Sequence, residues 1–251
     1  MSEPSRSDAA VLVSGGADSA VLSLELLGEH RRVFPLYIRF GLRWEETELS
    51  WLRAFLETTR VSRPGLMPLT VLDEPIAEVY GDHWSNARGS GVPDDRSSDE
   101  AVNLPGRNLL LAAKAAVWCR LRDIETLALG TLAANPFPDS TPEFFRDLES
   151  VLERAMDGRL SIVRPYSRLT KTDVLRRGAE LDLPLHLTFS CLDPVTGRHC
   201  GVCNKCAERL GAFRTAGLPD RTEYAANSPS GAPNGALLIR PFPFESRECT
   251  E

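Results

Sequence analysis

The chain has 251 residues, which is room for one large domain or for one domain with a small appendage. Hydrophobic residues make up 42% and charged residues 25%, as in an ordinary soluble globular protein. The net charge of −6 argues against wholesale binding to a nucleic-acid backbone, although a local basic groove stays open. No apolar stretch approaches the roughly 18–20 residues that cross a bilayer, and the start of the chain lacks a signal-peptide pattern. We expect a cytoplasmic protein with no membrane partner.

The most informative stretch covers residues 11–19 and reads Val-Leu-Val-Ser-Gly-Gly-Ala-Asp-Ser. It predicts a short buried strand, a glycine turn and a helix that continues to Leu27. Backbone N–H groups at such a helix start form an anion site, to which Ser14 and Ser19 add hydroxyls. The turn is neither a Walker loop, because no Gly-Lys-Ser/Thr follows, nor a dinucleotide fingerprint.

Strands and helices then alternate along the chain. Further strands are predicted at 33–38, 68–72, 126–131 and 160–163, and helices at 44–58, 109–121, after the cap Thr141, and after the cap Thr170. This alternation predicts an α/β fold with a doubly wound parallel sheet. Ligands bind outside the carboxyl ends of such strands, where the glycine turn and residues 39–43 would lie.

Two predicted helices begin with a cation, Arg107 and Lys171. A cation is unfavourable at a helix N-terminus unless an anion is near, so both are candidate phosphate or carboxylate partners. A solvent-facing side chain is the alternative for each. The polar stretch 81–103, which precedes the first of them, is either disordered or a functional lid, and we favour the lid.

Four cysteines crowd into sixteen residues, in the pattern Cys191-x8-Cys200-x2-Cys203-x2-Cys206. Four thiolates at short spacing predict a closed, structural zinc site, with an iron–sulfur cluster as the rival. Lys205 and Arg209 would partly offset the thiolate charge, and the neighbouring His199 is not expected to be a ligand. Cys119 is expected in the core, and Cys249 is expected to be a free thiol.

We divide the chain into a main domain at residues 1–184, a small zinc-binding helical element at 185–225 and a tail at 226–251. The tail is rich in Pro, Gly and Ser, and its apolar residues 237–239 are candidates for docking on the body.

Ser-Gly-Gly-x-Asp-Ser resembles the pyrophosphate loop of the PP-loop ATP pyrophosphatases, which share a Rossmann-like fold. Within that group the chain resembles the 7-cyano-7-deazaguanine synthases of queuosine precursor biosynthesis. The match rests on residues 14–19, on Gly41 and Arg43, on the Pro-Gly-Arg-Asn run at 105–108, on Phe-Pro-Asp at 137–139 before a helix with Glu143 and Phe144, and on the four cysteines.

The resemblance implies that ATP and ammonia convert 7-carboxy-7-deazaguanine to a nitrile through an acyl-adenylate, with Mg²⁺ helping and a homodimer as the assembly. Asp18, Arg107 and Lys171 would be catalytic. The ATP-binding residues would be Ser14, Gly15, Gly16, Ala17, Asp18 and Ser19. The substrate contacts would be Arg39, Gly41, Arg43, Asn108, Asn135, Phe137 and Asp139.

The sequence departs from the family at two places. Arg39-Phe40-Gly41 stands where the family has Asp-Tyr-Gly, and Asn135 to Ser140 replaces a segment with an acidic residue and Tyr-Pro-Asp-Cys. A divergent paralogue is one interpretation. The alternatives left open are a ligase that passes the acyl group to an amine of a protein or nucleic acid, a tRNA-thiolating enzyme, and a non-catalytic nucleotide-binding module.

Overall fold

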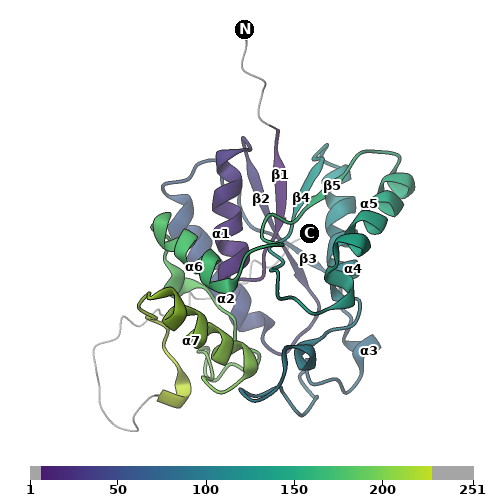
Figure 1. Cartoon of the computed structure of the whole chain (residues 1–251). Helices are drawn as coiled ribbons and strands as arrows, with labels where there is room; N and C mark the ends of the chain where they lie inside the picture. The colour runs from purple at the N-terminus through teal and green to yellow at the C-terminus, as the bar shows by residue number, and fades with distance from the viewer. Residues whose placement is uncertain (1–6, 228–251) are drawn as a thin grey trace, which may run out of the picture.

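A five-stranded parallel sheet forms the centre of the computed structural model, which describes residues 7–227. The strands lie in the order β3-β2-β1-β4-β5, and all neighbouring pairs are parallel (Figure 1). Their bounds are β1 Ala9–Leu12, β2 Val33–Arg39, β3 Thr70–Asp73, β4 Thr126–Ala128 and β5 Ser161–Val163. The predicted α/β class and parallel sheet are confirmed.

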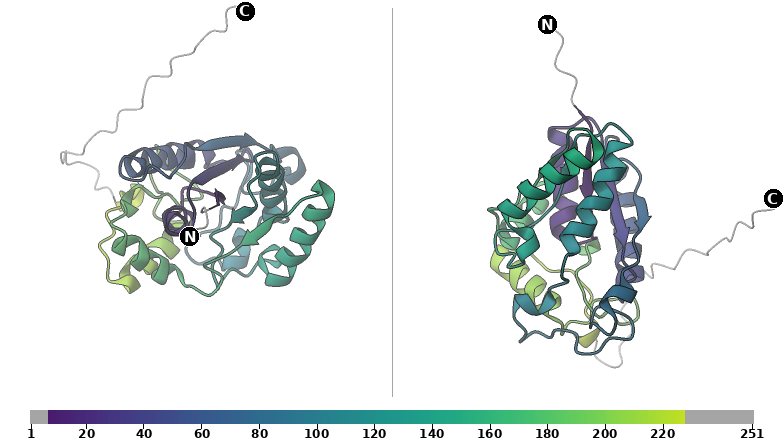
Figure 2. Two further views of the ribbon diagram at one scale, coloured as in Figure 1. Left: turned by 90° about the horizontal axis from the view of Figure 1, so that it is seen from above. Right: turned by 90° about the vertical axis from the view of Figure 1, so that its right-hand side faces the viewer.

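Helices cover both faces of this sheet (Figure 2). The α-helices are α1 Ala17–Glu25, α2 Glu45–Arg60, α3 Ala77–Tyr80, α4 Arg107–Arg120, α5 Pro142–Met156, α6 Lys171–Glu180 and α7 Asn204–Ala216. Short 3₁₀ turns lie at Leu26–Gly28, Asp99–Val102, Pro138–Ser140, Leu185–Leu187 and Ala225–Asn227. None of the described helices is long and apolar enough to cross a membrane.

The strand residues alternate between two hydrophobic cores, as the period of a strand requires. In β1, Ala10 and Leu12 join the core under α4 and α5, whereas Val11 joins the core under α1, α2, α6 and α7. Cys119 lies in the first of these cores, as predicted. The four cysteines at 191, 200, 203 and 206 also belong to this first core, whereas Ala212 and Phe213 of α7 pack into the second, so the cysteine-bearing segment is continuous with the sheet.

The helix starts follow the sequence signals. Thr141 accepts a hydrogen bond from the Phe144 N–H, and Thr170 forms a capping box with Asp173. The first helix begins at Ala17 rather than Ala20, so Asp18 and Ser19 belong to its first turn. Cys249 and the tail beyond residue 227 lie outside the described residues.

Candidate active site

A cavity of about 330 Å³ opens at the carboxyl ends of the strands, where β1 and β4 diverge into crossovers on opposite faces. This is the switch point at which open α/β sheets bind ligands. Residues from five α-helices and from the 3₁₀ turn Asp99–Val102 line it. The lining includes Ser14, Gly16, Asp18, Ser19, Tyr37, Phe40, Leu42, Trp44, Glu45, Glu48, Trp84, Asp99, Arg107, Asn108, Gly130, Thr131, Asn135, Phe137, Lys171, Ser190, Lys205 and Glu208.

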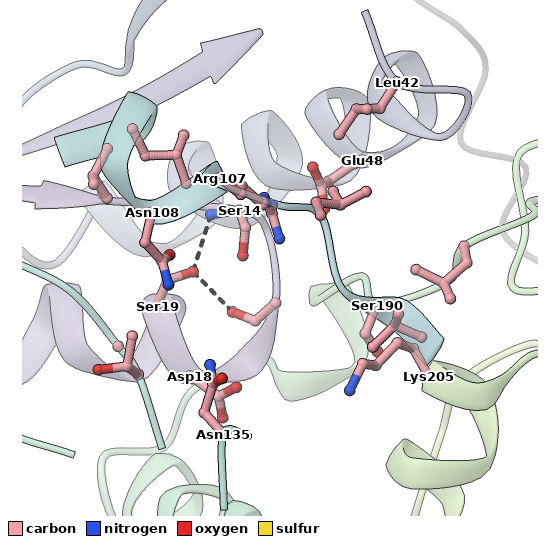
Figure 3. A pocket seen from close by; sticks show the side chains of 18 of the residues that line it. Ser14, Asp18, Ser19, Leu42, Glu48, Arg107, Asn108, Asn135, Ser190 and Lys205 are labelled. Carbon is pink, nitrogen blue, oxygen red and sulfur yellow. Dashed lines mark hydrogen bonds between the residues drawn. The ribbon is translucent and has the colours of Figure 1, made fainter. Parts of the chain in front are cut away.

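The glycine turn forms the floor of this cavity (Figure 3). Gly15 has a φ of +74°, which favours glycine, and Gly16 caps α1 without a side-chain hydrogen bond. The Ser14 N–H donates to Ser19 Oγ at 3.2 Å, and Ser19 Oγ donates to the Gly16 carbonyl at 3.2 Å. Since no side chain caps α1, its first N–H groups are available to an anion.

Gly130 lets β4 approach this turn closely. A Cβ at Gly130 would lie 3.3 Å from the Asp18 carbonyl carbon and from the Ser19 nitrogen. A larger residue would therefore push the start of α1 away from β4.

Asp18 and Lys171 form an ion pair across the mouth of the turn. Lys171 Nζ donates to Asp18 Oδ2 at 2.6 Å, and both side chains are about four-fifths buried. Burial raises the pKa of Asp18, although the neighbouring Lys171 acts against this rise. Burial acts to lower the pKa of Lys171, but the negative charges of Asp18 and Glu208 outweigh burial, so the pKa of Lys171 is raised. The lysine is thus held as a cation beside the anion site.

Four lining residues have buried polar atoms without a hydrogen-bond partner. They are Asp18 Oδ1, Arg107 Nε, Thr131 Oγ1 and Ser190 Oγ. Buried polar atoms are rarely left unpaired, because each such atom costs about 1–3 kcal/mol. Their concentration in one cavity indicates that a polar ligand completes it.

Asn108 and Asp139 hold the start of α4. The Asn108 N–H donates to Asp139 Oδ2 at 2.8 Å, and Asn108 Nδ2 donates to the Asp139 carbonyl at 3.0 Å. Asn108 lines the cavity, but Asp139 does not. Asp139 therefore holds Arg107 and Asn108 in place from a position outside the cavity.

Three of the predicted substrate residues, Arg39, Gly41 and Arg43, are not among the cavity lining. Arg39 forms ion pairs with Glu46 and Asp73, and Arg43 lies 3.6 Å from Asp193. The strand alternation explains this, because the intervening Phe40 and Leu42 point into the cavity instead. Asn135 and Phe137 do line it, so the structure brings together only part of the predicted substrate set.

Two buried carboxyl groups from α2 face the cavity. Glu45 accepts hydrogen bonds from the Phe40 and Gly41 N–H groups at 2.5 and 2.8 Å, whereas Glu48 accepts one from the Tyr37 hydroxyl at 2.6 Å. Burial raises the pKa of Glu48 to about 8, although Tyr37 and Arg107 act against the rise.

The end of the cavity away from the turn is aromatic. Trp44 and Trp84 stack with ring centroids 5.7 Å apart at an interplanar angle of 21°, beside Phe40 and Leu42. Trp84 comes from the segment 81–103, which forms a wall of the cavity. This segment is anchored to the start of α7, because Asn204 Nδ2 donates to the Ser97 carbonyl at 2.8 Å. A planar ring can pack against an aromatic surface of this kind.

The four cysteines form a buried cluster next to this wall. Their sulfur atoms all lie within 4.8 Å of one another, with Cys200 and Cys206 at 3.9 Å and Cys191 and Cys203 at 4.0 Å. These separations exceed the about 2.05 Å of a disulfide and approach the about 3.8 Å between corners of a tetrahedral Zn–S site. Backbone N–H groups donate to three of the sulfurs, as expected around thiolate ligands. The cluster can hold a metal ion.

Lys205 and Arg209 both bind oxygen atoms, and Arg209 also interacts electrostatically with Cys206. Lys205 Nζ lies 2.7 Å from Glu208 Oε2 and lines the cavity. Arg209 is buried and donates to Thr188, Thr222 and the Leu185 carbonyl. His199 is also buried and contributes no sulfur-cluster ligand; its Nε2 accepts from the Ser190 N–H at 3.2 Å.

Sequence analysis missed several cavity residues, among them Tyr37, Glu48, Trp84, Ser190 and Glu208. A signal existed for Glu48, since Glu45 and Glu48 share one helical face directly after the second strand. Lys205 and Glu208 flank Cys206 and are three residues apart, which places both on one side of α7. Nothing local marks Ser190, because the fold alone brings it to β1 and β4.

Fold and site together define an α/β protein with a phosphate-type turn and a buried polar cavity at its topological switch point. The family model described as "Queuosine biosynthesis protein QueC" matches residues 8–217. The chain therefore belongs to the QueC family.

Several relatives carry the name 7-cyano-7-deazaguanine synthase. The protein of Methanothermobacter thermautotrophicus is 30% identical over 226 residues, covering 85% of this chain and 97% of the relative. That of Novosphingobium aromaticivorans is 31% identical over 226 residues, covering 86% and 94%. The chain spans about half the length of other relatives, such as that of Saccharolobus solfataricus, where 30% identity over 224 residues covers 85% of this chain and 47% of the relative.

Two solved structures are more distant. The predicted subunit of a tRNA methyltransferase from Methanocaldococcus jannaschii has 14% identity and a TM-score of 0.45, covering 69% of this chain and 75% of its own. A 4-thiouridine synthetase in complex with RNA and bound ATP has 16% identity and a TM-score of 0.45, covering 84% and 50%.

Proposed function

We propose that this protein uses ATP and ammonia to convert 7-carboxy-7-deazaguanine into the nitrile 7-cyano-7-deazaguanine through an acyl-adenylate. The observation that carries the proposal is the uncapped turn at residues 14–19, which opens into a buried polar cavity with Arg107 and Lys171 at its edge. Relatives named for this synthase activity share most of the chain. The function is that of an AMP-releasing ligase that forms C–N bonds.

The charged end of the cavity suits ATP. The α1 N-terminus, the serine hydroxyls and the two cations would bind the phosphates, and they would stabilise the charge that develops as pyrophosphate leaves. The acid's carboxylate attacks the α-phosphorus, the bond to the pyrophosphate oxygen breaks, and acyl-adenylate and pyrophosphate result. Ammonia then replaces AMP to give the amide. Adenylation of the amide oxygen by a second ATP and loss of AMP leave the nitrile.

The aromatic end suits the deazapurine ring. Trp84 and Phe40 would contact its faces, and Asn135 and Asn108 would contact its polar edge. This assignment keeps Asn108, Asn135 and Phe137 as substrate contacts and leaves Arg39, Gly41 and Arg43 as positions that shape the strand end.

Mg²⁺ fits the charged end, because Asp18 Oδ1 is a buried carboxylate oxygen without a partner. Asp18 would hold the ion together with ATP phosphates. The ion would neutralise phosphate charge during adenylation.

Zinc fits the cysteine cluster, since four sulfurs at these separations leave no open coordination position. Its role would be structural. It would fix the segment that presents Ser190, Lys205 and Glu208 to the cavity.

The test is mass spectrometry of a reaction that contains the protein, MgATP, ammonium and 7-carboxy-7-deazaguanine. Nitrile and AMP that appear together would support the proposal. AMP or adenylate without nitrile would show retained activation with another acceptor, and no AMP would exclude this acid as substrate. The homodimer and the domain boundaries at 184 and 225 stay predictions.

A further inference from the structure

We propose that Glu48 is the general base that takes a proton from the attacking nitrogen when the acyl-adenylate is captured. The inference rests on the function proposed above and adds to it a residue that the proposed chemistry requires. Five carboxyl groups line the cavity, those of Asp18, Glu45, Glu48, Asp99 and Glu208.

Glu48 is the one such group in the described structure whose only side-chain partner is neutral. Asp18 is paired with Lys171, and Glu208 is paired with Lys205. Asp99 is half exposed and lies 3.9 Å from Lys205. Glu45 is occupied by two backbone N–H groups. Glu48 accepts only from the Tyr37 hydroxyl, through Oε2, so Oε1 is available to a ligand.

Glu48 also lies at the phosphate end of the cavity. A Cβ on Gly15 would be 3.3 Å from Glu48 Cγ, so the glutamate side chain packs directly on the glycine turn. Figure 3 shows Glu48 on the same side of the cavity as Arg107 and Ser14. The reacting acyl carbon must lie beside this turn, because its adenylate is joined to the α-phosphate. This position places Glu48 beside the reacting atoms.

The groups that face Glu48 bring its pKa close to neutral pH. Burial raises its pKa to about 8, with Glu45 adding to the rise, while Tyr37 and Arg107 lower it. Burial also raises the pKa of Tyr37, which keeps that hydroxyl a hydrogen-bond donor. A base works best when its pKa lies near the working pH.

The nitrogen lone pair forms the C–N bond to the acyl carbon, and the bond from that carbon to the AMP phosphate oxygen breaks, its electron pair leaving with AMP. One proton passes from nitrogen to Glu48 Oε1, and water removes it later. The products are the amide and AMP, with no oxidant or reductant involved.

The experiment compares wild type with Glu48→Gln, which keeps the size of the side chain and an oxygen for the Tyr37 hydroxyl. Adenylation is measured by exchange of pyrophosphate into ATP in the presence of 7-carboxy-7-deazaguanine, and capture by amide formation from ammonium. We expect capture to fall about 10²–10⁴-fold, the usual contribution of a general base, while exchange changes little. Glu57→Gln, an exposed position on the same helix, is the matched control and should change neither rate.

Hydroxylamine sharpens the test, because it is unprotonated at neutral pH and is a strong nucleophile. Capture by hydroxylamine should fall much less in the Glu48→Gln protein than capture by ammonium. Equal losses with both nucleophiles would overturn the proposal. Loss of exchange would also overturn it, since that result assigns Glu48 to ATP, Mg²⁺ or ring binding.

The pH profile provides a second readout that a structural role would not move. At a fixed concentration of free ammonia, capture by wild type should rise with pH through about 8. Tyr37→Phe removes a group that lowers the Glu48 pKa, so the rise should shift to higher pH; an unmoved profile would contradict the assignment. If wild type itself shows no exchange with this acid, the proposed function fails, and Glu48 is then tested with hydroxylamine and the acid that does support exchange.

Discussion

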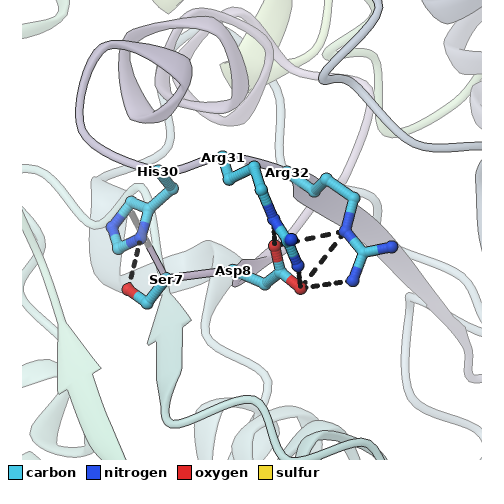
Figure 4. A network of polar contacts seen from close by, with 5 residues as sticks. All are labelled: Ser7, Asp8, His30, Arg31 and Arg32. Carbon is cyan, nitrogen blue, oxygen red and sulfur yellow. Dashed lines mark hydrogen bonds and ion pairs between the residues drawn. The ribbon is translucent and has the colours of Figure 1, made fainter. Parts of the chain in front are cut away.

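The two edges of the sheet carry contrasting charge clusters. At the amino edge, Asp8 accepts hydrogen bonds from Arg31 and Arg32 at 2.5–3.3 Å, and Ser7 contacts His30 (Figure 4). The Asp8 carboxylate is fully paired, and both arginines are substantially exposed. At the carboxyl edge, Asp18, Arg107 and Ser190 are half-buried, and each retains a buried polar atom without a partner.

The contrast separates a structural cluster from a binding one. Exposed ion pairs in water contribute little and need no further partner, so the amino-edge cluster merely ties β1 to the start of β2. Buried unpaired atoms are costly, so a fold keeps them where a ligand repays that cost. Function should therefore respond strongly at one edge and hardly at all at the other.

The largest effect is expected when the cysteine cluster beside the carboxyl edge can no longer hold the metal proposed for it. Cys206→Ser removes one of four sulfur ligands, and metal binding to such sites contributes on the order of 10 kcal/mol to folding of the bound segment. We expect loss of the bound zinc, a lower unfolding temperature and no AMP release. Elemental analysis and thermal unfolding provide the measurements. Cys119→Ser, outside the cluster, should keep the metal, and one iron-containing cluster per chain would contradict the zinc assignment.

Arg107→Gln should give the next largest effect. Removing a preorganised charge from an adenylation site should lower AMP formation by about 10²–10³-fold, in line with single donors elsewhere. Stability should change little, because Arg107 Nε has no partner to lose. The measurement is AMP release under saturating ATP, with thermal unfolding as the check on folding. A protein that turns over at the wild-type rate would remove Arg107 from the site.

The raised pKa of Glu48 should be detectable in the pH dependence of the free energy of unfolding. Its folded pKa of about 8 exceeds the usual value of 4.5, so the native state retains a proton that the unfolded chain releases. The contribution of Glu48 to the free energy of unfolding is therefore fully present below about pH 4.5 and is lost as pH rises through about 8. Glu48→Gln does not titrate, and we expect it to match wild type at pH 5 and to exceed it by about 1–3 kcal/mol at pH 9. Urea unfolding at both pH values measures this, and a constant difference would be the contrary result.

Local signals predicted the sheet, the glycine turn, the two threonine helix caps and the cysteine cluster, because each depends on a few neighbouring residues. The cavity lining could be predicted only in part, because it joins distant segments. Arg39 looked like a substrate residue from its place after a strand, yet strand alternation turns Phe40 and Leu42 inward. Glu48 reaches the glycine turn only because α2 packs there, and Lys171 meets Asp18 across 153 positions of sequence.

Asp8→Asn changes the cluster at the amino edge of the sheet and should have the smallest effect of these substitutions. The Arg32 and Arg31 guanidinium groups, working against partial burial, lower the pKa of Asp8 to about 2. The stability that this carboxylate supplies is therefore present above about pH 4 and is lost as pH falls toward 2. Because the arginines are exposed, we expect a loss below about 1 kcal/mol at neutral pH, and none at pH 2. AMP release should be unchanged, since the cluster lies at the edge opposite the cavity. A substantial drop in AMP release, with stability intact, would mean that the amino-edge cluster controls the active site. The presence or absence of unpaired polar atoms would then not distinguish a structural cluster from a functional one in this protein.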